Sequence, residues 1–259
     1  MTEKAKNAGS TNGMRKAICY CLTRNYYEKI IPSLNSMLYH TKIDTVYILA
    51  EDDEMPFPVP DCVKVINVSD QKYFKKTGIN YNSPWTYMVM MRGALADILK
   101  DEDQVLSIDA DTIIHEDISP LWDYDLTGYY LAGSRELELS QIHCQIYVNF
   151  GVIMLNLKEL RKMLPTGRAM WEELVWWMNN VQVKYIEQDT YNKLCAGKIL
   201  EITSDWNATC DPVKEGDPVR TFPTEHVRIR HYAGESGWWD YPEVEKWKGK
   251  VVNESQYVQ

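Results

Sequence analysis

Val105-Leu-Ser-Ile-Asp-Ala-Asp111 is an apolar run that ends in two carboxylates separated by one residue. The run predicts a buried strand, and side chains two apart on a strand project to the same side. Asp109 and Asp111 can therefore reach one divalent cation just past the strand end. Such oxygen ligands suit Mg²⁺ or Mn²⁺, which keep open positions for phosphate. The same triplet is also common as turn chemistry or as a cap, so both interpretations stay open on these residues alone.

The segments before this run alternate between strand and helix patterns. Short apolar runs predict strands, and apolar residues three and four apart predict helices. We expect strands at 16–23, 45–50 and 63–68, and helices at 30–38 and 83–99, the last opened by Ser83-Pro84. Strands that alternate with helices imply parallel pairing, so the predicted fold class is α/β, with a mostly parallel central sheet flanked by helices.

The segments after the run continue this pattern. Strands are predicted at 129–133, 147–157 and 227–235, a long helix over 160–181 and a short amphipathic helix over 185–194. Three tryptophans of the long helix are predicted to be core residues: Trp171, Trp176 and Trp177.

Several polar residues interrupt these apolar patterns. Arg92 lies on the apolar face of its helix, so it either needs an anionic partner or packs its stem while the guanidinium reaches water. Asn149 must find hydrogen-bond partners if it is buried, and Gly151 allows another backbone or a ligand to approach closely. These two expectations apply to one strand, over 147–157.

Acidic and amide side chains also crowd the start of the short helix, at Glu187, Gln188 and Asp189. Acids in a first turn can simply cap free backbone amides, and this interpretation stands beside a binding role for each.

Composition limits the class of protein. A chain of 259 residues that is 45% hydrophobic can bury the core of one large α/β domain. The net charge of −9 argues against a nucleic-acid surface, so any phosphate must be neutralised locally. The six cysteines form no C-x-x-C pair, which favours free thiols in a reducing compartment.

We expect a disordered leader over 1–14, a single domain over 15–250 and a flexible tail over 251–259. No signal-peptide or membrane-spanning pattern is present in the sequence, so the protein is predicted to be soluble and cytoplasmic. The aromatic residues near the end, Trp238, Trp239, Tyr241 and Trp247, could stack on a sugar or contact a membrane surface peripherally, but with few lysines around them ordinary packing is favoured.

Taken in order, six motifs resemble glycosyltransferase family 8, the family of glycogenin and of bacterial lipopolysaccharide galactosyl- and glucosyltransferases. The motifs are Thr23-Arg-Asn25-Tyr26, Arg92, Asp109-Ala-Asp111, Asn149-Phe-Gly151-Val152, Glu187-Gln188-Asp189 and His231-Tyr-Ala-Gly234. The resemblance covers about residues 16–240 and implies a nucleotide-diphospho-sugar transferase fold of the GT-A type.

The resemblance also implies a role for each residue. Mn²⁺, or Mg²⁺, would be coordinated by Asp109, Asp111 and His231 and would bridge the phosphates of a UDP-sugar. The imidazole favours Mn²⁺. The uridine would contact Thr23, Asn25 and Tyr26, with Arg92, Ala110 and Gly234 also at the donor. The transferred sugar would be surrounded by Glu136, Asn149, Glu187 and Gln188.

Two departures from the family pattern matter. Family members usually carry a phosphate-binding lysine shortly after the late glycine, whereas this chain reads Gly234-Glu-Ser-Gly237. Neutralisation of the leaving group would then rest more heavily on the metal, which puts the rate or the usual donor in doubt. Glu187 replaces the usual aspartate, and its longer side chain could alter sugar choice.

The resemblance implies a retaining, metal-dependent hexosyltransferase that uses a UDP-sugar and an unknown acceptor hydroxyl on a carbohydrate, a lipid-linked molecule or a protein. Gln188 is a poor nucleophile, so we hypothesise front-side attack by the acceptor, with Gln188 and Glu187 positioning the sugar. The missing lysine motivates an alternative, a low-turnover or inactive UDP-sugar-binding protein. A metal-dependent nucleotidyltransferase is disfavoured because the chain lacks a glycine-rich basic phosphate loop.

Overall fold

The computed structural model describes residues 14–143, 145–209, 221–234 and 237–249. The predicted tail, the leader before Met14 and Glu235 lie outside this part of the chain. The strands are β1 (Ala17–Cys21), β2 (Thr45–Ala50), β3 (Val63–Asn67), β4 (Gln104–Ile108), β5 (Thr112–Ile114), β6 (Leu131–Arg135), β7 (Val148–Asn156), β8 (Ile199–Ile202) and β9 (Ile229–His231). The α-helices are α1 (Ile31–His40), α2 (Thr86–Met90), α3 (Leu95–Ile98), α4 (Leu137–His143), α5 (Leu157–Leu160), α6 (Met170–Asn180), α7 (Ile186–Leu194) and α8 (Pro242–Lys248). The 3₁₀ helices are Arg24–Tyr26, Glu28–Ile30, Met91–Ala94, Ser119–Asp123, Ser204–Trp206 and Trp238–Asp240.

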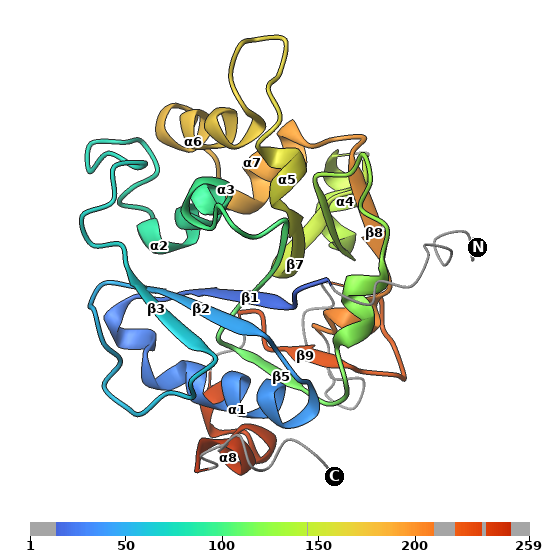
Figure 1. The fold of residues 1–259 in the computed structure, drawn as a ribbon. Helices are drawn as coiled ribbons and strands as arrows, with labels where there is room; N and C mark the ends of the chain where they lie inside the picture. Colours follow the sequence, from blue (N-terminus) through green and yellow to red (C-terminus); the bar gives the residue numbers. More distant parts are fainter. Residues whose placement is uncertain (1–13, 144, 210–220, 235–236, 250–259) are drawn as a thin grey trace.

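Seven strands form the central sheet, in the order β3-β2-β1-β4-β7-β6-β8 (Figure 1). The pairs β1–β2, β1–β4, β2–β3 and β6–β8 are parallel, which confirms the mostly parallel sheet. β7 runs antiparallel to both β4 and β6, so the sheet is mixed around this strand. An apolar run looks the same in either direction, and its pattern therefore carries no strand polarity.

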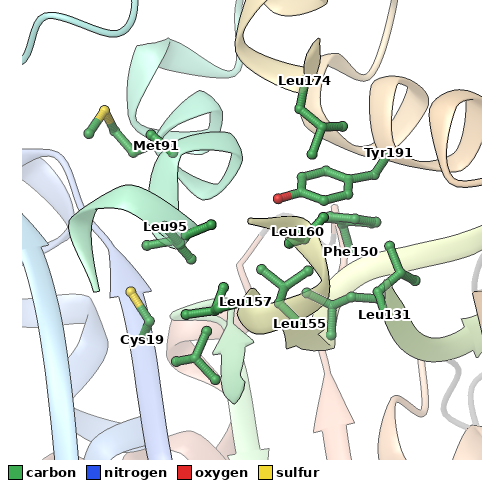
Figure 2. Close-up of a cluster of buried hydrophobic side chains, with 14 of the residues drawn as sticks. Cys19, Met91, Leu95, Leu131, Phe150, Leu155, Leu157, Leu160, Leu174 and Tyr191 are labelled. Carbon is green, nitrogen blue, oxygen red and sulfur yellow. The ribbon is translucent and has the colours of Figure 1, made fainter. Parts of the chain in front are cut away.

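Hydrophobic residues cover both faces of this sheet. Alternate side chains of β1 enter different clusters: Ala17 and Cys19 on one face, Ile18 and Tyr20 on the other. In Figure 1, α2, α3, α6 and α7 lie above the sheet and α1 lies below it. Figure 2 shows the upper cluster, in which the ring of Tyr191 from α7 lies 4.9 Å, centroid to centroid, from that of Phe150 on β7. Burial on both faces holds the carboxyl ends of β1 and β4 rigidly.

A second, two-stranded sheet pairs β5 with β9 in antiparallel register, with Thr112 opposite His231. β4 ends at Ile108, earlier than predicted, so Asp109-Ala-Asp111 is the link by which the chain passes from the central sheet into β5. β9 is likewise shorter than the predicted strand 227–235 and ends at His231. The pairing of the small sheet therefore brings His231 beside the acidic link.

The helix predicted over 83–99 is divided. Ser83 and Pro84 form a separate turn, because Thr86 has a φ of 62°, through which a right-handed helix cannot continue. The helical segments α2 and α3 are joined by the 3₁₀ turn Met91–Ala94, where the Tyr191 hydroxyl donates to the Arg92 carbonyl at 2.9 Å. The prediction was thus right about helical character and wrong about the start and the continuity.

The helix predicted over 160–181 was wrong in its first half. α5 ends at Leu160 and α6 begins only at Met170. Between them a turn is closed by the hydrogen bond from the Leu164 amide to the Arg168 carbonyl, 2.7 Å, and Gly167 has a φ of 81°. Pro165 and Gly167 are helix-breaking signals that the apolar spacing outweighed in the prediction.

The aromatic residues near the end pack as expected. Trp238 and Trp247 are buried in a small cluster with Ile113, Tyr232 and Val244, and Trp239 and Tyr241 pack against it partly buried. Trp176 of α6 does not follow the core prediction, since 44% of its surface is exposed. None of the described helices is long and apolar enough to span a membrane.

Candidate metal and donor site

Asp109, Asp111 and His231 converge as the sequence predicted. One potential ligand atom from each lies within 4.8 Å of the others. The His231 Nε2 atom is 3.6 Å from Asp109 Oδ2 and 3.5 Å from Asp111 Oδ1. His231 is buried, whereas both carboxylates are partly open to solvent, so a cation and its remaining ligands could enter from the acidic side.

Backbone hydrogen bonds hold the two acids in place. The Asp109 amide donates to the Gly151 carbonyl on β7 at 2.8 Å, and the Thr112 hydroxyl donates to the Asp109 carbonyl at 2.8 Å. The Tyr232 amide donates to the Asp111 carbonyl at 2.9 Å, so the strand that carries His231 also fixes Asp111. The acidic link is therefore tied to β7 on one side and to β9 on the other.

Gly151 provides the space that His231 occupies. A Cβ atom at position 151 would lie 1.9 Å from His231 Cε1 and 2.3 Å from its Nδ1, distances that no packing tolerates. The close approach expected at this glycine is thus made by the imidazole ring of a residue 80 positions later in the chain.

Opposing influences act on the pKa of Asp111. Burial disfavours its charged form, but the neighbouring His231 and Arg92 together hold the pKa below its usual value. The carboxylate is therefore kept ionised, which is the form that coordinates a cation.

Arg92 has the anionic partners that its position required. Its guanidinium is buried and forms ion pairs with Asp109 and, at 3.1 Å, with Glu187, and it donates to the Phe150 carbonyl at 3.3 Å. Burial alone would lower the pKa of Arg92, but the two carboxylates raise it above its ordinary value. The group is a permanent positive charge beside the acidic link.

The three polar residues that open α7 take different roles. Burial raises the pKa of Glu187 against the opposing effect of Arg92. Gln188 accepts a hydrogen bond from the Phe150 amide at 2.9 Å, which holds its side chain against β7. Asp189 accepts from the amides of Lys184 and Tyr185 and from the Tyr147 hydroxyl, so for Asp189 the capping interpretation is confirmed.

A cavity of about 140 Å³ lies over this assembly. Its lining includes eight of the residues predicted from sequence: Arg92, Asp109, Asp111, Asn149, Glu187, Gln188, His231 and Gly234. Trp85 and Tyr185 also line it, with ring centroids 6.1 Å apart. Among the described lining residues, Arg92 is the permanent cation.

The other five predicted residues lie outside this lining. Thr23, Asn25 and Tyr26 follow β1, and burial together with the charges of Asp111 and Asp109 raises the pKa of Tyr26. Ala110 is buried within the acidic link. Glu136 is also buried, and its Oε2 accepts from the Asn149 Nδ2 at 2.6 Å.

Asn207 is a residue that the sequence reading missed. It lies after the 3₁₀ turn Ser204–Trp206, its Oδ1 is 2.9 Å from His231 Nδ1, and its Nδ2 donates to Asn149 Oδ1 at 2.9 Å. Its segment has no strand or helix periodicity, and its partners are 24 and 58 positions away, so no spacing could have indicated it.

Comparison with known proteins agrees with this geometry. The sequence model described as "Glycosyl transferase family 8" matches residues 17–242. A relative from Haemophilus influenzae is 28% identical over 186 residues, which are 66% of this chain and about half, 53%, of that protein. The lipopolysaccharide 1,2-glucosyltransferase of Escherichia coli is 28% identical over 270 residues, which cover 91% of this chain and 77% of that protein.

Among solved structures, the galactosyltransferase LgtC in complex with donor and acceptor sugar analogues superposes with a TM-score of 0.64. It is 20% identical and covers 92% of this chain and 98% of that one. The fold is that of the GT-A glycosyltransferases. Within that class, the chain belongs to glycosyltransferase family 8.

Proposed function

We propose that this chain is a retaining, metal-dependent glycosyltransferase that transfers a hexose from a UDP-sugar to an acceptor hydroxyl. The convergence of Asp109, Asp111 and His231 at the carboxyl end of β4 carries the proposal. Family membership supports glycosyl transfer, and the glucosyl- and galactosyltransferases among the similar proteins support a hexose as the transferred group. The acceptor is left as a carbohydrate, a lipid-linked molecule or a protein.

The donor set fits Mn²⁺. Two carboxylate oxygens and one imidazole nitrogen face a common point, and the other ring nitrogen of His231 is turned to Asn207. Carboxylates alone would suit Mg²⁺ equally, and the imidazole is what favours the transition ion. A bound divalent cation would supply Lewis-acid neutralisation of the departing diphosphate.

The chain's own residues would orient the donor and exclude water. Arg92 adds a fixed positive charge next to Asp109, and preorganised charge near a leaving group is usually the largest catalytic contribution. Gln188 accepts from the Phe150 amide and donates to the Tyr147 hydroxyl at 3.4 Å, so its other amide hydrogen would be available to the donor. Glu187 is held by Arg92 and would accept from a sugar hydroxyl.

Retention of configuration would proceed by front-side attack. Of the carboxylates that line the cavity, Glu187 is paired with Arg92, and Asp109 and Asp111 would hold the metal; Asp189, next to Gln188, caps backbone amides. Each is already engaged, which supports attack by the acceptor hydroxyl itself over a two-carboxylate double displacement. The acceptor proton would pass to the departing phosphate oxygen.

Substitution of the acids tests the proposal. Asp109→Asn and Asp111→Asn should each abolish Mn²⁺-dependent release of UDP from a UDP-hexose. Asp103→Asn is the matched control, because Asp103 precedes β4 at the opposite end of the same strand. Full activity of either site variant without added metal would overturn the metal assignment. Thermal shifts with UDP-glucose, UDP-galactose, UDP-N-acetylglucosamine and GDP-mannose would identify the donor, since a ligand that binds only the folded state stabilises it.

A low-turnover UDP-sugar-binding protein is the second candidate. In the described lining the permanent cation is Arg92, and the chain lacks the lysine that family members usually carry after the late glycine. This difference favours the binding protein. Calorimetry with UDP and Mn²⁺ beside the release assay separates the two functions: tight binding without hydrolysis or transfer selects the binder.

The cytoplasm is the compartment that we propose. The described cysteines Cys19, Cys21 and Cys195 are free thiols, which supports a reducing environment. Thiol alkylation immediately after cell lysis, followed by mass spectrometry, should find them reduced.

A further inference from the structure

A chain of buried polar side chains leads away from the metal site. It runs from His231 to Asn207, from Asn207 to Asn149, and from Asn149 to Glu136. At most 4% of the surface of any member is exposed. Buried polar groups must be hydrogen-bonded, so each contact restricts the orientation of the next group.

The direction of this chain is set by a backbone amide. The Gly151 N–H can only donate, and it donates to Asn149 at 2.9 Å, so the acceptor oxygen of Asn149 must face it. The same oxygen then accepts from Asn207, which must present its amide nitrogen there. The carbonyl oxygen of Asn207 is consequently the atom that faces His231 Nδ1.

An oxygen at that place determines where the imidazole proton lies. Asn207 Oδ1 can only accept, so His231 Nδ1 must carry a hydrogen. In the neutral ring this leaves the lone pair on Nε2, the atom that faces Asp109 and Asp111. The opposite tautomer would point an N–H at the place of the cation and exclude it.

We propose that Asn207 is a positioning residue that holds the His231 proton on Nδ1 and thereby directs the Nε2 lone pair at the metal. The proposal rests on the proposed metal site. The backbone around Asn207 suits this task, because its amide donates to the Ser204 carbonyl at 3.0 Å and its carbonyl accepts from the Thr221 hydroxyl at 2.9 Å. The next residue, Ala208, is bonded to β9 itself, so Asn207 and His231 are held in one frame.

The test is Mn²⁺ affinity measured by electron paramagnetic resonance on the whole chain. Asn207→Leu removes both polar atoms and should weaken Mn²⁺ binding about 10- to 100-fold, the usual effect of losing an orienting partner. Asn207→Asp keeps an acceptor oxygen for His231 and loses the donor to Asn149, so it should stay within about threefold of the wild type.

A matched control comes from another buried asparagine. Asn156, at the end of β7, donates to the carbonyls of Leu126 and Tyr129 and caps the Glu159 amide, away from the site. Asn156→Leu should lose stability and keep its Mn²⁺ affinity. Equal affinity of Asn207→Leu and wild type overturns the proposal, and so does an Asn207→Asp variant as weak as Asn207→Leu.

A second measurement needs neither metal nor the leucine variant. Nitrogen-15 NMR of histidine-labelled, metal-free wild type, at a pH where the ring is neutral, should find His231 protonated on Nδ1. Protonation on Nε2 overturns the role of Asn207 even if Mn²⁺ binds. If the wild type has the Nδ1 tautomer but does not bind Mn²⁺, the proposed function is overturned. The role of Asn207 in orienting the His231 ring would still stand.

Discussion

Two cavities of this molecule differ both in size and in the chemistry of the groups that line them. The larger, about 540 Å³, lies between residues 75–78 and α6, while the one over the acidic link is about 140 Å³. In the larger cavity the polar groups are used locally: Asn179 accepts from the Lys75 amide, and Arg168 pairs with Glu173. Trp176 lines its wall.

The small cavity is built differently. Its lining includes two acids from the link after β4 and a third from α7, with Gly151 of β7, His231 of β9 and the arginine of the turn between α2 and α3. Chain segments far apart in the sequence deliver unlike charges to one point, which costs stability unless the groups are paired or bind a ligand. Convergence of such groups, more than volume, therefore identifies a site of chemistry.

The largest effect on Mn²⁺ affinity should come from filling the space of His231. In Gly151→Ala the new methyl group would overlap the imidazole, so the ring must leave its place. We expect Mn²⁺ affinity to fall by about 100-fold or more and stability to fall by about 1–3 kcal/mol. Titration with Mn²⁺ and urea unfolding measure the two effects separately.

Gly133→Ala is the control for that substitution. Gly133 lies on β6 opposite Ile153, and a Cβ there would be 2.4 Å from Ile153 Cδ1. This variant should lose similar stability without loss of Mn²⁺ affinity. If both variants lose Mn²⁺ equally, the site depends on the general packing of the sheet and the contrast between the two cavities fails.

Removal of Arg92 should have the largest effect on stability. Arg92→Met leaves Glu187 and Asp109 without their buried cation and should cost about 3–5 kcal/mol near neutral pH. The pKa of Glu187 is already raised by burial and should rise further. The folded state then binds a proton that the unfolded chain releases, so stability falls as pH rises from the ordinary pKa through the folded one.

Urea unfolding across the range from about pH 5 to about pH 8 measures this dependence. Arg92→Met should regain part of its stability toward the acidic end, and Arg92→Met/Glu187→Gln should lose most of the pH dependence. If the stability of the Arg92→Met variant instead rose with pH, the pairing of Arg92 with Glu187 would be contradicted.

The fold could be predicted where local patterns decide it. The short apolar run through Ala17, Ile18, Cys19 and Tyr20 predicted the first strand, and both of its faces are buried. The direction of β7 could not be predicted, since polarity depends on partners that lie elsewhere in the sequence. The turn at Pro165 was predictable, because proline and the nearby Gly167 are helix-breaking signals.

The candidate site likewise contains residues that could be predicted from the sequence and a residue that could not. Asp109, Asp111 and His231 were predicted because they belong to motifs whose order along the chain resembles a known family, and the structure brings them together. Asn207 could not be predicted, because its hydrogen bonds to Asn149 on β7 and His231 on β9 join segments that are far apart in the sequence. A pattern in the sequence can indicate ligands, whereas their orienting partners follow from tertiary contacts.

The smallest effect should come from the large cavity. Arg168→Ala removes an exposed ion pair with Glu173 and a weak contact with the Trp176 ring, 6.0 Å from its centroid. Because half of the Arg168 side chain is exposed, solvent screens this pair, and the loss should stay below about 1 kcal/mol. Mn²⁺ affinity and UDP release should be unchanged within about twofold. A tenfold fall in UDP release at constant stability would mean that the larger cavity takes part in the reaction, since solvent screens the effect of a surface ion pair on groups outside its own neighbourhood.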